Sequence, residues 1–126
     1  MTFDEFQKEA LKTAIYPGNA AVVYPAMGLA GEAGEVANKV QKLIRDHNIL
    51  DDTYIMSLSN QELHDHHEKI NDLTDAICDE LGDVLWFAAV LAYDVGESFD
   101  YIAEKVLLRL KDRQERGVLK GSGDNR

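Results

Sequence analysis

The amino-acid sequence predicts an all-α protein, and three observations carry that prediction. Apolar residues recur at three- and four-residue spacing through most of the chain, which is the period of an amphipathic helix. Capping boxes stand at Thr2–Glu5 and at Ser59–Glu62, where helices would begin. No segment of the sequence shows the sustained alternation of apolar and polar residues that is typical of a β-strand.

The first two predicted helices have signals at their ends. The first spans about 3–15 and is followed by a loop that ends at Pro25. The second spans about 27–45 and stops at a run of polar residues. The stretch 46–60 has mixed signals and receives no firm assignment.

The second half of the chain predicts two more helices. One spans about 61–94, where large aliphatic residues fall seven apart, and the sequence leaves open a break near Thr74. Gly96 is typical of a helix end, and Ser98 is typical of the next N-cap. The last helix then covers about 99–116.

Length and composition indicate a single globular domain. The chain has 126 residues, of which 45% are hydrophobic and 29% charged, as in globular domains and unlike disordered chains. We expect one domain over 1–126, with a helical body over 1–117. The polar, glycine-rich tail at 118–126 is expected to be mobile or to close over a substrate.

Several features predict a cytoplasmic protein that does not enter a membrane. The longest apolar run, from Val84 to Tyr93, is too short to cross a bilayer. The N-terminal residues are acidic where a signal peptide would be basic and then apolar. The lone cysteine, Cys78, excludes an internal disulfide, fits a reducing compartment and is expected to be a small packing residue.

The negative charge of the chain is concentrated in one segment. The net charge is −10, and residues 46–83 contain eleven acidic side chains against one basic side chain, Lys69. An acidic surface repels a phosphate backbone, so nucleic acid is not an expected partner. A small phosphorylated ligand remains compatible with this surface if a metal ion lies between the two.

Two matched pairs of carboxylates stand out on the second and third predicted helices. On a helical wheel, Glu32 lies about 70° and Glu35 about 130° from the centre of the apolar stripe of their helix. Glu80 and Asp83 occupy the same two angular positions on the other helix. The two helices therefore offer matching pairs at the edge of a core face.

Four converging carboxylates predict a divalent cation, because like charges raise one another's pKa. Oxygen ligands suit Mg²⁺, with Mn²⁺ as a possible substitute, whereas di-iron bundles use Glu-x-x-His motifs that this chain lacks. Glycines beside the pairs cost about 1 kcal/mol each relative to alanine in a helix. Close helix packing or close ligand approach would offset that cost at these positions: Gly28, Gly31, Gly34 and Gly82.

These motifs resemble the MazG-like nucleoside triphosphate pyrophosphohydrolases. The stretch from Gly28 to Val36, with Glu32 and Glu35, and the later stretch from Asp79 to Trp86 match the paired signature of that family. The resemblance implies a four-helix-bundle-like fold that assembles as a homodimer or a dimer of dimers. It also implies Mg²⁺-dependent hydrolysis of a nucleoside triphosphate between the α- and β-phosphates. The products would be a nucleoside monophosphate and pyrophosphate, and the expected role is cleansing of the nucleotide pool.

The resemblance also assigns roles to individual residues. Glu32, Glu35, Glu80 and Asp83 would be the Mg²⁺ ligands, with Glu35 orienting or deprotonating the attacking water. Lys39 could hold a phosphate or pair with Glu35 one turn away, and Phe87 could lie near the nucleotide or at the edge of the core. Apart from the resemblance, Trp86 is expected at a subunit interface, because it lies almost opposite the apolar stripe of its helix. The remaining substrate-contact candidates are Gln7, Arg109 and Lys120.

The chain departs from the family pattern in two places. The gap between the two acidic motifs is long, which predicts an inserted segment at about 46–75. In the last helix, Val106 and Arg109 stand where the family often has asparagine and lysine. Lys120 and Arg126 in the tail are further candidates for closing on a phosphate.

Two alternatives keep the same carboxylates without the hydrolase activity. One is a non-catalytic helical module that binds metal or mediates oligomerisation, and the other is an iron-holding carboxylate oxidase. The histidine-rich run His64–His67 could bind a transition metal, but its expected state is a solvated polar face.

Overall fold

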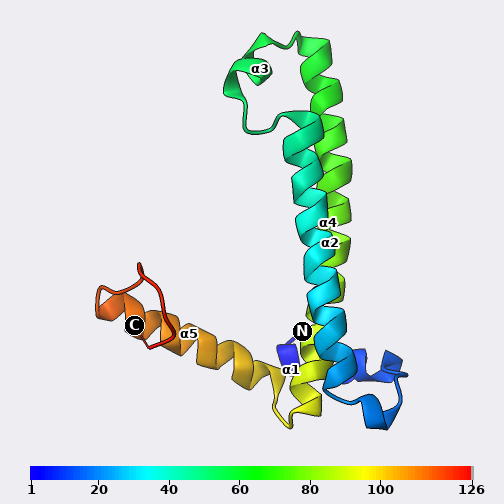
Figure 1. Ribbon diagram of the computed structural model, residues 1–126, viewed down its shortest axis with the longest axis vertical. Coiled ribbons are helices and arrows are strands. Elements are labelled where there is room, and N and C mark those ends of the chain that lie inside the picture. Colours follow the sequence, from blue (N-terminus) through cyan, green and yellow to red (C-terminus); the bar gives the residue numbers. More distant parts are fainter. Residues whose placement is uncertain (126) are drawn as a thin grey trace. The chain divides into compact units, whose positions relative to one another are not determined.

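The computed structural model describes residues 1–125 and confirms the all-α prediction, since no strand forms within that range. Figure 1 shows its helices, whose bounds are as follows: α1 Phe3–Ala10, α2 Val23–His47, α3 Asp52–Ser57, α4 Asn60–Asp94 and α5 Phe99–Glu115, with short 3₁₀ helices at Leu11–Thr13 and Gly18–Ala20.

Contacts within the chain divide it into two compact units. The terminal unit combines Met1–Val22 with Ala89–Arg126, and the hairpin unit is Val23–Ala88. Helix α4 is continuous and contributes its last residues, from Ala89, to the terminal unit. No helix in the described range is long and apolar enough to cross a membrane.

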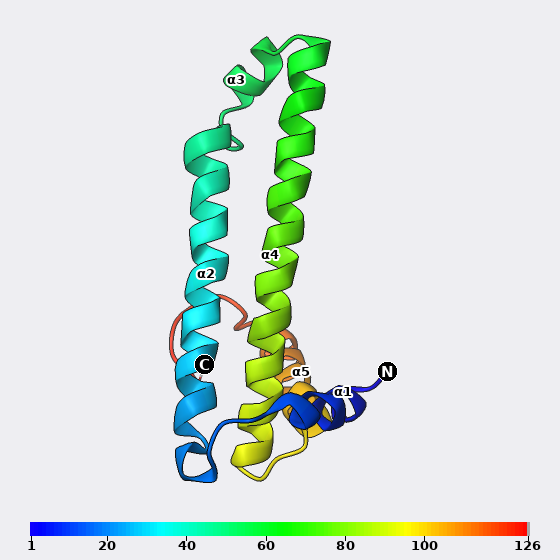
Figure 2. The same ribbon diagram turned by 90° about the vertical axis from the view of Figure 1, so that its right-hand side faces the viewer.

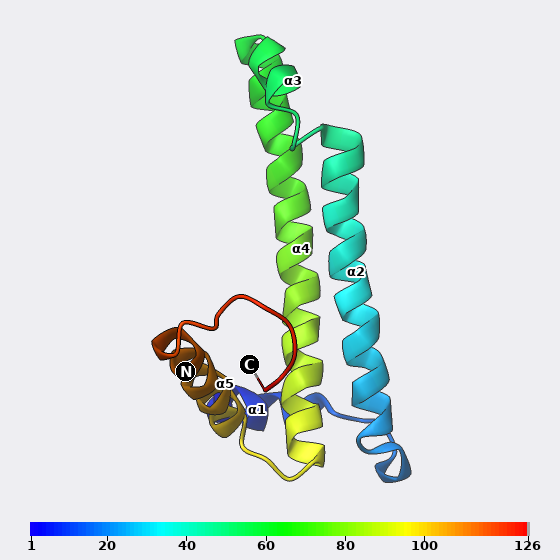
Figure 3. The same cartoon turned by 60° about the vertical axis from the view of Figure 1, so that its left-hand side comes forward.

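The hairpin unit consists of α2 and α4 lying side by side in opposite directions, with α3 in the connection at one end (Figures 2 and 3). Of the predicted apolar stripes, Leu43 is buried, but many members are only half-buried within the chain. Ile44 on α2 remains 43% exposed and Leu81 on α4 remains 49% exposed. The pairing of these two helices therefore covers only part of their apolar surface.

The terminal unit has a small core and a reciprocal helix cap. The Phe3 and Phe99 rings meet edge to face, with centroids 5.1 Å apart. Asp100 accepts hydrogen bonds from the first backbone N–H groups of α1, and Asp4 accepts one from the backbone N–H of Asp100 at 2.8 Å. Each carboxylate thus satisfies orphan donors at the start of the other helix.

A second set of hydrogen bonds in this unit centres on Asp94. Its Oδ2 accepts from the Tyr16 hydroxyl and from the backbone N–H of Val22, both at 2.8 Å. Burial and the Asp94 carboxylate raise the pKa of Tyr16 to about 12. Val22 has a φ of 67°, a conformation that is uncommon for a β-branched residue, and the bond to Asp94 holds it there.

The structure corrects several predicted boundaries. Helix α1 ends at Ala10, not near residue 15, because the chain tightens into a 3₁₀ turn. Helix α2 begins at Val23, so Pro25 lies in its first turn, where a missing N–H costs nothing, and not in a loop. Helix α4 is unbroken at Thr74, whose hydroxyl donates to the Ile70 carbonyl.

The structure also shows what occupies the long gap between the two acidic motifs. The range 46–75, predicted to be an inserted segment, forms the end of α2, the short α3 and the first sixteen residues of α4. The predicted extra length therefore extends the hairpin. Cys78, expected to be a packing residue, is instead exposed on α4.

Candidate functional site

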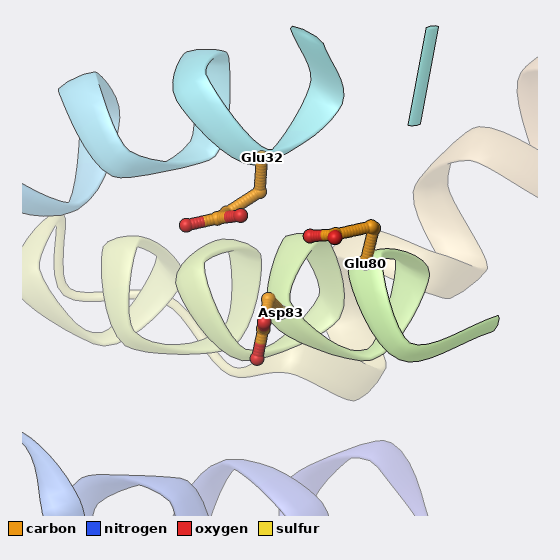
Figure 4. Close-up of side chains that lie close together, drawn as sticks. All are labelled: Glu32, Glu80 and Asp83. Atoms are coloured by element: carbon orange, nitrogen blue, oxygen red, sulfur yellow. The ribbon is translucent and has the colours of Figure 1, made fainter. Parts of the chain in front are cut away.

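Three carboxylates of the hairpin unit converge between its two long helices. Glu32 comes from α2, and Glu80 and Asp83 come from α4 (Figure 4). One carboxylate oxygen from each residue lies within 4.8 Å of one from each of the others. Glu32 and Glu80 are half-buried, whereas Asp83 is exposed.

The local sequence explains this convergence. The i, i+3 spacing of Glu80 and Asp83 puts both side chains on one face of α4, which is continuous through this region. The antiparallel pairing with α2 then brings Glu32 opposite them. Since both helices contribute, the group exists only when the hairpin is formed.

The electrostatics of the group are unfavourable without a cation. Burial, followed by the negative charges of Asp83 and Glu80, raises the pKa of Glu32 above its usual value. Lys39 supplies one counter-charge, because its Nζ lies 3.1 Å from Oε1 of Glu80. Three carboxylates against one ammonium leave an excess of negative charge. A donor set made of carboxylate oxygens alone fits a hard divalent cation.

Glu35 is not part of this converging group. Its side chain is exposed, although its charge contributes to the raised pKa of Glu32. Lys39 does not pair with Glu35, the intrahelical partner considered from the sequence, but reaches across to Glu80 on α4. The sequence could have indicated this contact, because Lys39 follows Glu32 by seven residues and therefore lies on the helical face that carries Glu32.

Phe87 is packed against α2 by way of Gly28. A Cβ placed on Gly28 would overlap the Phe87 ring, so this glycine is required by helix packing. Tyr24 and Trp86 flank the ring, with centroids 6.3 Å and 4.9 Å away. This packing supports the edge-of-core interpretation of Phe87.

The other motif glycines have no such packing reason within the chain. A Cβ added to any of them would meet nothing within 4 Å: Gly31, Gly34 and Gly82. Helix packing therefore offsets the cost of Gly28 alone among the four. Open space beside the other three leaves room for a ligand or another chain to approach the backbone.

The predicted substrate contacts outside the hairpin lie in the terminal unit. Gln7 is buried, and its Nε2 donates to the carbonyl oxygens of Ala89 at 3.0 Å and Glu97 at 3.2 Å. Its side-chain nitrogen is thus engaged in holding α1, which leaves a base contact to Oε1. Arg109 on α5 and Lys120 in the tail are exposed, and Arg126 lies outside the described residues.

Comparisons with known proteins agree with this geometry. A family model described as "MazG nucleotide pyrophosphohydrolase domain" matches residues 26–117, which include all the carboxylates of the group. The chain is also similar to the "Gene 37 protein" of Mycobacterium phage L5, with 38% identity over 132 aligned residues that cover both chains completely. No solved structure matches the chain. The matched family depends on divalent metal ions, in accord with the acidic group. The chain belongs to the MazG nucleotide pyrophosphohydrolase family.

Proposed function

We propose that this protein is a Mg²⁺-dependent nucleoside triphosphate pyrophosphohydrolase that cleaves its substrate between the α- and β-phosphates. The products are a (deoxy)nucleoside monophosphate and pyrophosphate, and the expected role is cleansing of the nucleotide pool. The observation that carries the proposal is the convergence of Glu32, Glu80 and Asp83 from two helices. Carboxylates held this close repel one another, and a cation bound among them would offset that repulsion and let a triphosphate approach an acidic surface.

In this proposal Glu32, Glu80 and Asp83 hold the ion, and Glu35 completes the set by turning inward from its exposed position. Bound there, Mg²⁺, or Mn²⁺ as a substitute, would offset phosphate charge and lower the pKa of a coordinated water. Glu35 is also the proposed catalytic residue, because a carboxylate turned toward the ion from an exposed position can orient an attacking water or accept its proton.

The substrate would be held by cationic and aromatic side chains around the group. Lys39 is the nearest ammonium, and it can bind a phosphate oxygen in place of Glu80. Phe87 would border the nucleotide from the edge of the core. Gln7, Arg109 and Lys120 are proposed contacts from the terminal unit.

We further propose that the protein works as a homodimer or a dimer of dimers. Large apolar side chains remain exposed on both long helices, including Val40 and Ile44 on α2 and Leu81 and Leu85 on α4. The members of each of these pairs are four residues apart and share a helix face, and apolar surface grouped in this way marks interaction sites in soluble proteins. Pairing with another copy would bury it, and Trp86 is the proposed marker of that interface.

A product-resolved substrate panel tests the activity. Purified protein is incubated with each NTP and dNTP and Mg²⁺, and the products are separated and identified. We expect nucleoside monophosphate and pyrophosphate in equal amounts from at least one nucleotide, with no turnover in EDTA.

Two variants connect the activity to the site. Asp83→Asn should abolish turnover, whereas Asp75→Asn, an exposed aspartate on the same helix, should leave it intact. Release of orthophosphate without pyrophosphate would contradict the cleavage position. Metal-dependent thermal stabilisation with no turnover of any nucleotide would instead support the non-catalytic metal-binding module.

A further inference from the structure

A cavity of about 260 Å³ lies at the end of the hairpin unit that carries α3. Its position along α4 is about 20 Å from the carboxylate group, since His66 precedes Glu80 by fourteen residues and each residue rises 1.5 Å. We call it the tip cavity, and the residues that matter here come from all three helices around it: Asp46 and His47 from α2, Tyr54 from α3, and Glu62, Asp65 and His66 from α4.

His66 is the unusual member of this cavity wall. The sequence predicted a solvated run at His64–His67, and His64 and His67 are indeed exposed, but His66 is only 7% exposed. Its Nε2 is fully buried and has no hydrogen-bond partner among the described residues. Leaving a buried polar atom without a partner costs about 1–3 kcal/mol, and such atoms are rare in folded proteins. Something outside the chain is therefore expected to contact this nitrogen.

The chemistry of the wall indicates a cation. Three carboxylates surround the cavity, and Lys69 is the one lysine or arginine among its lining residues. All three carboxylates already accept one local set of hydrogen bonds: Arg45 chelates Asp46, Gln61 donates to Oδ1 of Asp65 at 2.8 Å, and the Ser59 hydroxyl and backbone N–H donate to Oε2 of Glu62. The lining as a whole nevertheless carries three carboxylates against one ammonium, and this net negative charge favours a positively charged group in the cavity.

The kind of cation follows from the second imidazole. The His47 ring faces that of His66, with centroids 6.3 Å apart and planes inclined at 64°. Imidazole nitrogens together with a carboxylate favour Zn²⁺, Co²⁺ or Ni²⁺, whereas Mg²⁺ prefers an all-oxygen shell. The tip cavity thus differs in donor chemistry from the carboxylate group, where every ligand is oxygen.

We propose that the tip cavity binds one transition-metal ion of the Zn²⁺ class, with His66 Nε2 and a His47 nitrogen as ligands and a wall carboxylate as the oxygen ligand. The proposed ligand atoms do not yet converge. Among the described residues, the group whose ligand atoms all lie within 4.8 Å of one another is Glu32, Glu80 and Asp83. Binding would therefore draw His47 and one carboxylate inward, and it would tie the end of α2 to the start of α4 across α3. This proposal does not depend on the proposed enzymatic activity.

Cobalt titration of the untagged full-length protein tests the site. The titration is run in excess Mg²⁺, which occupies all-oxygen sites, and the visible absorption of Co²⁺ bound through nitrogen is recorded. We expect one Co²⁺ per chain, displaced by Zn²⁺, and Zn²⁺ should raise the thermal unfolding midpoint. His66→Gln and His47→Gln should each weaken binding by at least about tenfold.

The matched control is His64→Gln, because His64 lies on the same helix but is exposed and is 3.5 Å from Glu68. That variant should bind Co²⁺ like the wild type. Failure of the wild type to bind Co²⁺ or Zn²⁺ would overturn the proposal and leave water as the partner of His66. Unchanged binding in His66→Gln would also overturn it. Should His66→Gln lose helicity by circular dichroism, the half-buried His47→Gln decides the outcome in the same way.

Discussion

In the terminal unit, Asp4, Asp94 and Asp100 each accept two or more hydrogen bonds, whereas the carboxylates of the candidate site in the hairpin unit face one another. The backbone N–H of Asp100, followed by the Ser98 hydroxyl, holds the pKa of Asp4 below its usual value. In the hairpin unit, burial and like charges raise the pKa of Glu32. A carboxylate that has donors stabilises the fold, and one that lacks them is prepared for a cation.

Apolar burial differs between the two units in the same sense. Of the buried apolar residues, Pro25 and Leu43 belong to the hairpin unit and the remainder belong to the terminal unit: Ala10, Ala89, Val90, Ala92 and Phe99. The hairpin is held as an extended helix pair whose apolar stripes stay partly open. Its surface is therefore suited to an external partner.

Removal of one aspartate from each unit should have opposite consequences. Asp83→Asn is expected to reduce nucleotide turnover by at least about 100-fold without lowering the unfolding midpoint in EDTA, since it relieves charge repulsion. Asp94→Ala removes the acceptor for Tyr16 and Val22, so it should lower the free energy of unfolding by about 2 kcal/mol. Turnover assays and urea denaturation of both variants measure the two effects. A large loss of stability in Asp83→Asn would contradict this difference between the two units.

Gln7→Ala should be among the most destabilising single changes in the terminal unit. It withdraws both side-chain N–H donors from the carbonyls of Ala89 and Glu97, at a cost of about 2–3 kcal/mol. The exposed Gln61→Ala serves as the control and should change stability by less than about 0.5 kcal/mol. Denaturant midpoints measure both. If Gln7→Ala raised KM and left stability unchanged, Gln7 would act as a substrate contact and not as a structural one.

The motif glycines should divide into two classes. Gly28→Ala forces its Cβ into the Phe87 ring and should destabilise the protein by about 1–3 kcal/mol. Gly31→Ala meets open space and should stabilise the isolated chain by up to about 1 kcal/mol. Calorimetry compares the two. If Gly31→Ala kept its stability but lost activity or self-association, the open space at Gly31 would be occupied in the working enzyme.

The smallest expected effects are opposite dependences of stability on pH. The raised pKa of Glu32 contributes stability that is lost as the pH rises from its ordinary value of 4.5 through the raised value. The lowered pKa of Asp4 contributes stability above its ordinary 3.8, which is lost as the pH falls below that value.

Unfolding midpoints in EDTA from acid to neutral pH measure both contributions. The unfolding midpoint of Glu32→Gln should rise relative to that of the wild type as the pH increases past 4.5. The unfolding midpoint of Asp4→Asn should lie below that of the wild type at neutral pH, and this difference should disappear below pH 3.8. Mg²⁺ should cancel the first effect and leave the second. If the unfolding midpoints of the two variants changed with pH in the same direction relative to the wild type, the carboxylates of the two units would not differ as described.

The amino-acid sequence by itself determined the helical class, the capping boxes and the acidic pairs. These features depend on spacing within about four residues, and helical geometry converts such spacing directly into a shared face. For the same reason Glu80 and Asp83 could be placed together in advance, and the family could be identified from the motifs that contain them.

Only the tertiary structure decided which groups meet across helices. It joined Lys39 to Glu80, left Glu35 outside the converging carboxylates, turned Gln7 into a buried link and buried His66 among exposed histidines. Each of these outcomes depends on the register of one helix against another or on where a connection folds back. Register is set by packing over the whole length of the elements, and no local pattern of residues records it.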